Sequence, residues 1–146
     1  MVKIEASVTV DRPVATVWKF ITDVSSYSKT DPDCLEARQT SAGPFGLGTT
    51  WQVRRSKTPK VQDFRVTGYE PNRRLSLEIT SGPAKGTKAI ESLENIEGKT
   101  RLTENADYKF SGFYKLFEPF MRGRMKEESE ARVGTAKRIL ESEAQL

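Results

Sequence analysis

Residues 3–10 alternate between polar and apolar side chains. One side would carry the apolar set, Ile4, Ala6, Val8 and Val10. A period of two predicts a half-buried antiparallel strand. Residues 14–21 then bring apolar side chains round at helical spacing, after a candidate N-cap, Asp11, and a proline, Pro13, that a first helical turn tolerates. This pattern predicts a short helix, and the turn-rich residues 24–33 predict at most one further helical turn.

From residue 34 to residue 110 the pattern is that of short strands divided by turn signals. The segments are 34–40, 49–56, 61–70, 75–82, 84–96 and 99–110. The last two segments are joined across Glu97 and Gly98, a tight-turn pair. Strands that follow one another through short turns imply an antiparallel sheet.

The C-terminal part of the chain changes to a period of 3.6 residues. Its apolar side chains form roughly one stripe: Phe113, Phe117, Phe120, Met121, Met125 and Ile139. The pattern predicts a helix of about thirty residues, roughly 45 Å long, in which Pro119 either causes a kink or marks the true start. Because sheets twist, seven strands curl, and a curled sheet that grips one long helix can leave a hollow between the two.

The segment GPFGLGTTWQV, residues 43–53, raises the question of a phosphate-binding loop. A Walker loop needs Gly-Lys-Ser/Thr leading into a helix, whereas Gly48 is followed by two threonines, Trp51 and a predicted strand. The dinucleotide fingerprint also stands between a strand and a helix, and its glycine spacing differs. Without a helix N-terminus there is no dipole to hold phosphate. We therefore expect a connector between two strands here, and also at residues 82–88.

The composition narrows the possible chemistry. Cys34 is the only cysteine, so neither an internal disulfide nor a cysteine-based metal cage can form, and a half-buried apolar role is expected for it. Histidine is absent, which removes the usual general base, the Ser-His and Cys-His pairings and nearly all zinc chemistry. Any catalysis would use Asp, Glu, Lys, Arg or Tyr, and we expect neither a metal ion nor a cofactor.

The charge is +4, with basic and acidic residues interspersed rather than gathered on one face. The densest basic clusters, residues 54–55, 73–74 and 122–126, are therefore expected to be solvated surface. No apolar run approaches the roughly 18 residues of a membrane helix, and the start of the chain does not look like a secretory signal. We expect a cytoplasmic protein without stable membrane insertion and without a nucleic-acid partner.

At this point the sequence resembles the START-like (SRPBCC) superfamily, in particular its polyketide cyclase/dehydrase and lipid-transport branch. The resemblance is carried by residues 10–33, 43–53, 66–78 and 98–110 and by the C-terminal amphipathic helix, in the family's order over nearly the whole chain. One residue departs: many relatives have a tryptophan just before the Asp-Pro-Asp stretch, where this chain has Thr30. The resemblance therefore does not extend to an aromatic lid at that corner.

The resemblance implies an α+β helix-grip fold in one domain, residues 1–146. A seven-stranded curved antiparallel sheet would wrap around the long C-terminal helix, with two short helices between the first and second strands. It also implies a cavity between sheet and helix that binds a small hydrophobic or amphipathic molecule.

Strand alternation predicts which side chains face that helix. Arg55, Glu91 and Glu104 fall at formally inward positions, where a buried charge needs a salt bridge, water or a ligand. Alternatively, strand ends and bulges could turn them to solvent, Arg55 could pair with a glutamate, and the methionine stripe could be plain core. The candidate ligand-binding residues are Trp51, Val53, Arg55, Phe64, Leu77, Glu91, Glu104, Tyr108, Phe117, Met121 and Met125.

Three functions remain open from the sequence. The favoured one is binding of a lipid, an isoprenoid or an aromatic polyketide. The second is a cyclase or dehydratase of the same fold, in which Glu91 or Glu104 would act as base while Arg55 or Tyr108 polarises a carbonyl. The third is an interaction module for a protein or nucleic acid. The sequence leaves open whether any reaction is catalysed, and it allows a monomer or a homodimer.

Overall fold

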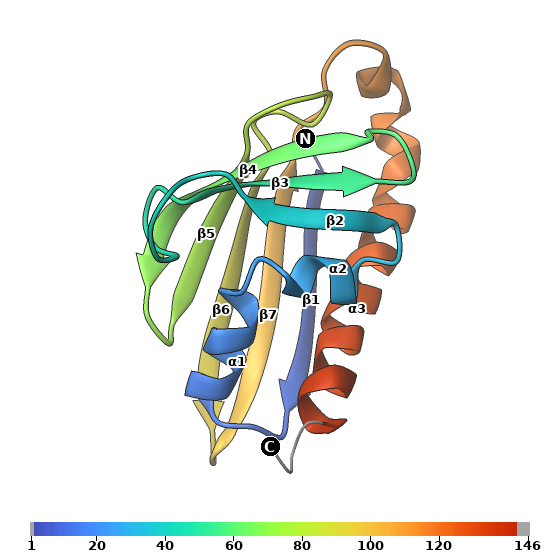
Figure 1. Ribbon diagram of the computed structural model, residues 1–146. Helices are drawn as coiled ribbons and strands as arrows, with labels where there is room; N and C mark the ends of the chain where they lie inside the picture. The colour runs from blue at the N-terminus through green and yellow to red at the C-terminus, as the bar shows by residue number, and fades with distance from the viewer. Residues whose placement is uncertain (1, 143–146) are drawn as a thin grey trace.

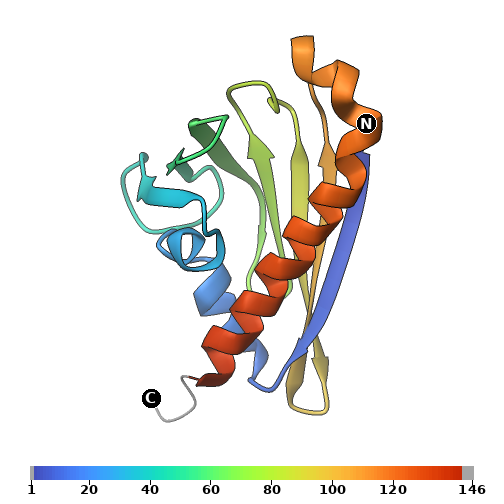
Figure 2. The ribbon, with the colours of Figure 1, turned by 90° about the vertical axis from the view of Figure 1, so that its right-hand side faces the viewer.

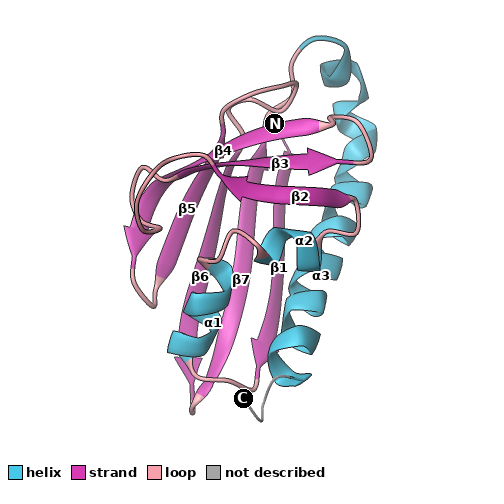
Figure 3. Ribbon diagram, in the orientation of Figure 1, coloured by secondary structure: helices cyan, strands magenta, loops and turns pink. Residues whose placement is uncertain are grey.

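The computed structural model describes residues 2–142, and its strands form one antiparallel sheet (Figures 1 and 3). The strands are β1 (Val2–Val10), β2 (Cys34–Gln39), β3 (Thr50–Arg55), β4 (Val61–Glu70), β5 (Arg74–Ile79), β6 (Lys88–Ile96) and β7 (Lys99–Tyr108). The helices are α1 (Val14–Ile21), α2 (Ser26–Thr30), the 3₁₀ segment η1 (Gly112–Phe117) and α3 (Glu118–Ser142). The order across the sheet is β1-β7-β6-β5-β4-β3-β2. The first strand therefore pairs with the last, and the predicted helix-grip fold is confirmed.

The sheet curls strongly, and local irregularities contribute to this. A register shift interrupts the β4–β5 ladder between Val66 and Gly68, and such bulges increase the local twist. At Gly68 a Cβ atom would lie 2.8 Å from the Ser76 hydroxyl oxygen, so only glycine allows the two strands to approach this closely. The consequence is that β2 and β3 run across the direction of β6 and β7 and partly enclose the space in front of them (Figure 1).

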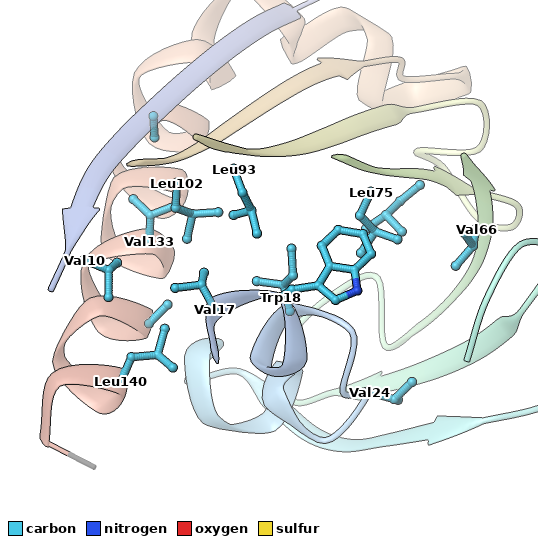
Figure 4. Packing of buried hydrophobic residues seen from close by; sticks show 14 of the residues in the cluster. Val10, Val17, Trp18, Val24, Val66, Leu75, Leu93, Leu102, Val133 and Leu140 are labelled. Atoms are coloured by element: carbon cyan, nitrogen blue, oxygen red, sulfur yellow. The ribbon is translucent and has the colours of Figure 1, made fainter. Parts of the chain in front are cut away.

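Helix α3 lies diagonally across the concave side of this curled sheet (Figure 2). Its C-terminal half is packed into the main core through Val133, Ala136 and Leu140, which are nearly inaccessible to solvent. Figure 4 shows Val133 and Leu140 facing Val17 of α1 and Leu102 of β7. Full burial of a side chain of this size contributes about 1.5–3 kcal/mol. The packing against β1, together with β7 and α1, therefore holds this half of the helix on the sheet.

The end of α3 is also fixed by hydrogen bonds to the segment between β1 and α1. Arg12 Nε donates to the Leu140 carbonyl oxygen at 3.0 Å, and the Asp11 backbone N–H donates to Glu141 Oε2 at 2.9 Å. A cation on the last carbonyls of a helix satisfies them and opposes the helix dipole favourably. The prediction that Asp11 caps α1 is wrong, because α1 begins two residues later than that cap implies, with Pro13 at its N-cap and no side-chain cap.

The N-terminal part of the predicted C-terminal helix differs from the expectation. The α-helix has 25 residues rather than about thirty, and η1 precedes it. Pro119 is the second residue of α3 and thus marks its start. Phe117 and Phe120 are 45% and 82% exposed, so their place in one buried stripe with Met121 is wrong. Phe117 leaves the stripe because η1 does not continue the α-helical period. Phe120 leaves it because it lies about 100° around the helix from Met121. The side chain of Phe113 lies outside the described part.

The glycine-rich segment connects β2 to β3, as predicted. Gly43 and Gly48 have φ angles of 88° and 85°, which favour glycine. The Gly48 N–H donates to the Val66 carbonyl at 3.0 Å, and the Gly46 N–H donates to Thr49 Oγ1 at 2.9 Å. Because these amides are engaged within the fold, the loop offers neither of them to a phosphate.

Candidate functional site

A cavity of about 250 Å³ lies between the concave face of the sheet and the N-terminal half of α3, and it is partly open to solvent. Small-molecule pockets commonly measure roughly 300–1,000 Å³, and an engineered cavity of about 150 Å³ binds benzene. The cavity is thus small for a ligand site and large for a packing defect. Its size suits a compact molecule, or one end of a longer molecule.

Most of the wall is apolar. The side chains come from β3, β4, β5 and β7, from the segment after β7 and from α3: Val53, Phe64, Leu77, Ile79, Ala106, Phe110, Met121 and Met125. The rings of Tyr108 and Phe110 are stacked in parallel, with centroids 6.0 Å apart. Methionine side chains adapt to irregular shapes, and Met121 and Met125 cover the cavity from the helix side.

A buried ion pair joins the sheet to the helix at the cavity wall. Both carboxylate oxygens of Glu104 in β7 accept hydrogen bonds from Arg132 in α3. The distances are 2.6 Å from Nη2 to Oε1 and 3.2 Å from Nε to Oε2. Glu104 is only 5% exposed, and the adjacent carboxylate raises the pKa of Arg132 well above its ordinary value. A bidentate ion pair of this kind offsets the desolvation cost of a buried carboxylate.

Glu91 lies directly opposite Glu104 in the β6–β7 register and also lines the cavity. Its Oε2 atom is inaccessible to solvent and has no hydrogen-bond partner within the described residues. Burial, and next the charge of Glu104, raise the pKa of Glu91 from 4.5 to about 8, against the opposing effect of Arg132. At neutral pH this carboxyl group is therefore protonated and carries an O–H donor.

Two phenols complete this end of the cavity. Burial raises the pKa of Tyr108, whose hydroxyl oxygen accepts a hydrogen bond from Arg132. Burial, and next Glu91 and Glu104, raise the pKa of Tyr27 well above its ordinary value. Both phenols are neutral at physiological pH. We call Tyr27, Glu91, Glu104, Tyr108 and Arg132 the polar end of the cavity.

Arg55 belongs to a different part of the wall. Its guanidinium lies 3.2 Å from Asp31 Oδ2 and 3.9 Å from Asp33 Oδ2, and so ties the corner between α2 and β2 to β3. The alternative that Arg55 pairs with a glutamate is therefore wrong: its partners are aspartates. With two carboxylates beside it, Arg55 offers little net charge to a ligand.

The predicted site residues fall into two groups. The larger group lines the cavity: Val53, Arg55, Phe64, Leu77, Glu91, Glu104, Tyr108, Met121 and Met125. Trp51 and Phe117 are not part of the wall. Trp51 is fully buried in the main core, where its ring stacks on Phe64 at 5.2 Å and Phe45 covers it, and Phe117 is exposed at the end of η1. That any of these residues binds a ligand remains a prediction.

Several contributors to the wall were not among the predicted site residues, and Arg132 and Tyr27 are two that carry polar groups. Arg132 follows Met121, Met125 and Glu128 at intervals of four, three and four residues, so the helical period places all of them on one face. That signal could have identified it. Tyr27 gives no such signal, because its ring reaches the cavity only through the packing of α2 against Trp51 and Phe64.

The described residues contain neither a candidate metal cluster nor a candidate membrane-spanning helix. No cluster of three or more His, Cys, Asp or Glu side chains there could hold a metal ion. No helix between residues 2 and 142 is long and apolar enough to cross a membrane.

With this geometry established, the sequence can be compared with known proteins. Residues 1–141 match the family described as polyketide cyclase / dehydrase and lipid transport. The chain belongs to this family. A comparison with curated protein sequences finds no match. The family assignment confirms the resemblance seen in the sequence.

Solved structures share the fold at low sequence identity. A protein from Thermus thermophilus is 12% identical, with a TM-score of 0.78 over 99% of both chains. A protein from Nitrosospira multiformis is 14% identical, with a TM-score of 0.74 over 99% of both chains. The di-domain ARO/CYC StfQ from the steffimycin biosynthetic pathway is 11% identical, with a TM-score of 0.78 over 99% of this chain and 52% of StfQ. At these identities the likeness establishes the fold alone.

Proposed function

We propose that this protein binds a small hydrophobic or amphipathic molecule in the cavity between the sheet and α3. The observation that carries the proposal is a partly open cavity of about 250 Å³, with an apolar wall and its polar groups gathered in a few places. Ligand sites typically combine an apolar wall with a few polar groups that fix orientation. Family membership supports the same reading.

The ligand is of the lipid, isoprenoid or aromatic polyketide type. The volume corresponds to about eight water molecules at about 30 Å³ each, so one or two rings fit inside. A longer chain would have to extend through the opening. The family description, polyketide cyclase / dehydrase and lipid transport, supports the aromatic polyketide type within this range, as does the similarity to the ARO/CYC protein StfQ.

Native mass spectrometry of the protein purified from its own host tests this proposal. We expect a co-purifying small molecule, and we expect the variant Ala89→Phe to lose it, since Ala89 lines the cavity and a phenyl ring there would take up much of the space. Ala131→Phe is the matched control, because Ala131 lies exposed on α3. Retention of the molecule by a folded Ala89→Phe protein would show that it does not bind in this cavity.

A polyketide cyclase or dehydratase activity is the second candidate, and the protonation state of Glu91 favours it. A carboxyl group that holds its proton at neutral pH and lies in a cavity can act as a general acid. Glu104 and Arg55 are already engaged by charged partners, which leaves Glu91 and Tyr108 as the better placed candidates. Turnover of a linear poly-ketone substrate, followed by absorbance of the aromatic product, should then fall in Glu91→Gln. Full turnover in that variant would remove Glu91 from the mechanism.

The ion pairs support a small molecule, rather than a nucleic acid, as partner. Arg54 pairs with Glu36, while Arg73 and Arg74 both pair with Glu70. Adjacent arginines that already form ion pairs with carboxylates have less positive charge available for phosphate groups. The absence of a nucleic-acid partner, the cytoplasmic location and the monomeric or homodimeric state stay predictions.

A further inference from the structure

Two carboxyl groups face each other at the polar end of the cavity, and only one guanidinium group there is available to pair with them. Glu91 and Glu104 are direct partners in the β6–β7 register. Arg132 places two of its nitrogens on the two oxygens of Glu104, which balances that charge. Arg55 and Arg124, which also line the cavity, have acidic partners of their own in Asp31 and Glu128. Among the described residues no other Lys or Arg lines the cavity, so no cation there is left over for Glu91.

The surroundings of Glu91 therefore favour its neutral form. The titratable groups that interact with it are Glu104 of β7, Arg132 of α3 and Tyr27 of α2. Of these only Arg132 is positive, and it already forms an ion pair with Glu104. A buried polar atom without a partner, such as Glu91 Oε2, is rare in folded proteins and calls for a specific explanation, of which bound water or a catalytic role are examples.

We propose that Glu91 donates its carboxyl proton in a hydrogen bond to a carbonyl oxygen of the ligand, so that the cavity selects neutral, carbonyl-bearing apolar molecules. This inference rests on the proposed function and names the chemical class of its ligand. The carbonyl would meet the neutral carboxyl at the polar end, while the rest of the molecule packs against Leu77, Phe64 and the methionines.

Other charge types fit this site less well. A carboxylate ligand would meet Glu104, and no guanidinium on the wall is free of an acidic partner to receive it. An ammonium ligand could pair with ionised Glu91, but both charges would lose their hydration, and the ammonium would come close to Arg132. A carbonyl loses far less hydration on burial. A neutral hydrogen-bond acceptor therefore has the smallest desolvation cost on binding in this cavity.

Four naphthalene probes of nearly equal shape test the inference by calorimetry at pH 6.5. These are 2-acetylnaphthalene, 2-ethylnaphthalene, 2-naphthoate and 2-naphthylmethylammonium. A buried neutral hydrogen bond corresponds to about fivefold to tenfold in affinity. We expect the ketone to bind at least about fivefold more tightly than 2-ethylnaphthalene and than either charged probe.

The pH dependence and the variants at position 91 separate hydrogen bonding from shape. Below about pH 7 Glu91 keeps its proton, and ketone affinity should be constant. Above about pH 8 Glu91 loses it, and affinity should fall by up to about tenfold per pH unit. Glu91→Gln retains an N–H donor that does not titrate, so the preference for the ketone should persist and the decline above pH 8 should disappear. Glu91→Leu should abolish the preference, and Glu94→Gln, at an exposed position of the same strand, should behave as wild type.

The outcomes distinguish this inference from the function on which it depends. Equal binding of the ketone and 2-ethylnaphthalene, or tightest binding of the ammonium or of the carboxylate, overturns the donor role of Glu91 and leaves ligand binding in the cavity intact. An unchanged pH profile in Glu91→Gln overturns it as well. If none of the four probes binds and nothing co-purifies with the wild-type protein, both the inference and the proposed function fail.

Discussion

The two halves of α3 do different things on the same sheet. Between Ser129 and Leu140 the helix presents small or compact side chains that are buried against β1, β7 and α1. Between Met121 and Glu128 its side chains are longer, several carry charge, and all of them are half-buried or exposed. The C-terminal half is part of the hydrophobic core, and the N-terminal half forms one wall of the cavity. Since both halves share a backbone, the difference comes from side-chain size and polarity.

This comparison shows how a cavity persists in a folded domain. The packed half, with its anchors at Arg12 and Lys137, fixes the position of the whole helix, because Lys137 also binds the Thr9 carbonyl at 2.6 Å. The other half then cannot move in to fill the space. Empty volume normally reduces stability, so its retention here is consistent with use of that space.

Removing the ion pair at the junction of the two halves should have the largest effect. Arg132→Met leaves Glu104 buried without its partner beside Glu91, and such losses cost about 3–5 kcal/mol in unfolding free energy. Denaturant unfolding at pH 7 measures the change. The double variant Glu104→Leu with Arg132→Met removes both charges and should recover most of the loss. A double variant no more stable than Arg132→Met would mean that packing by the arginine, rather than charge pairing, was lost.

Truncation in the packed half should come next in size. Leu140 is 3% exposed in the main core, so Leu140→Ala removes apolar contacts and leaves a void, at a cost of about 2–4 kcal/mol. Thermal and denaturant unfolding would detect this loss. A change below about 1 kcal/mol would show that the packed half does not fix the helix, and the comparison would then fail.

The sequence contains enough information for the frame of the molecule and for much of the cavity wall. Strand alternation placed Glu91 and Glu104 on the inner face because side chains along a strand alternate between the two faces of the sheet. It could not separate Trp51 from Val53, which share that face, because the curl of the sheet and the approach of Tyr27 decide which of them is covered. It also could not show that η1 interrupts the helical period before Phe117, or that Asp31 and Asp33 would engage Arg55.

Truncation over the cavity should have the smallest effect on stability and the opposite effect on binding. Met125 lines the cavity and is half-buried, so Met125→Ala enlarges space that already exists. We expect a loss of about 1 kcal/mol, less than half that of Leu140→Ala, because fewer contacts are removed. The larger cavity should also bind a three-ring ketone, 2-acetylanthracene, more tightly relative to 2-acetylnaphthalene than the wild type does. Equal losses for the two truncations would mean that both halves of α3 are packed alike, and an unchanged preference between the two ketones would place their binding away from Met125.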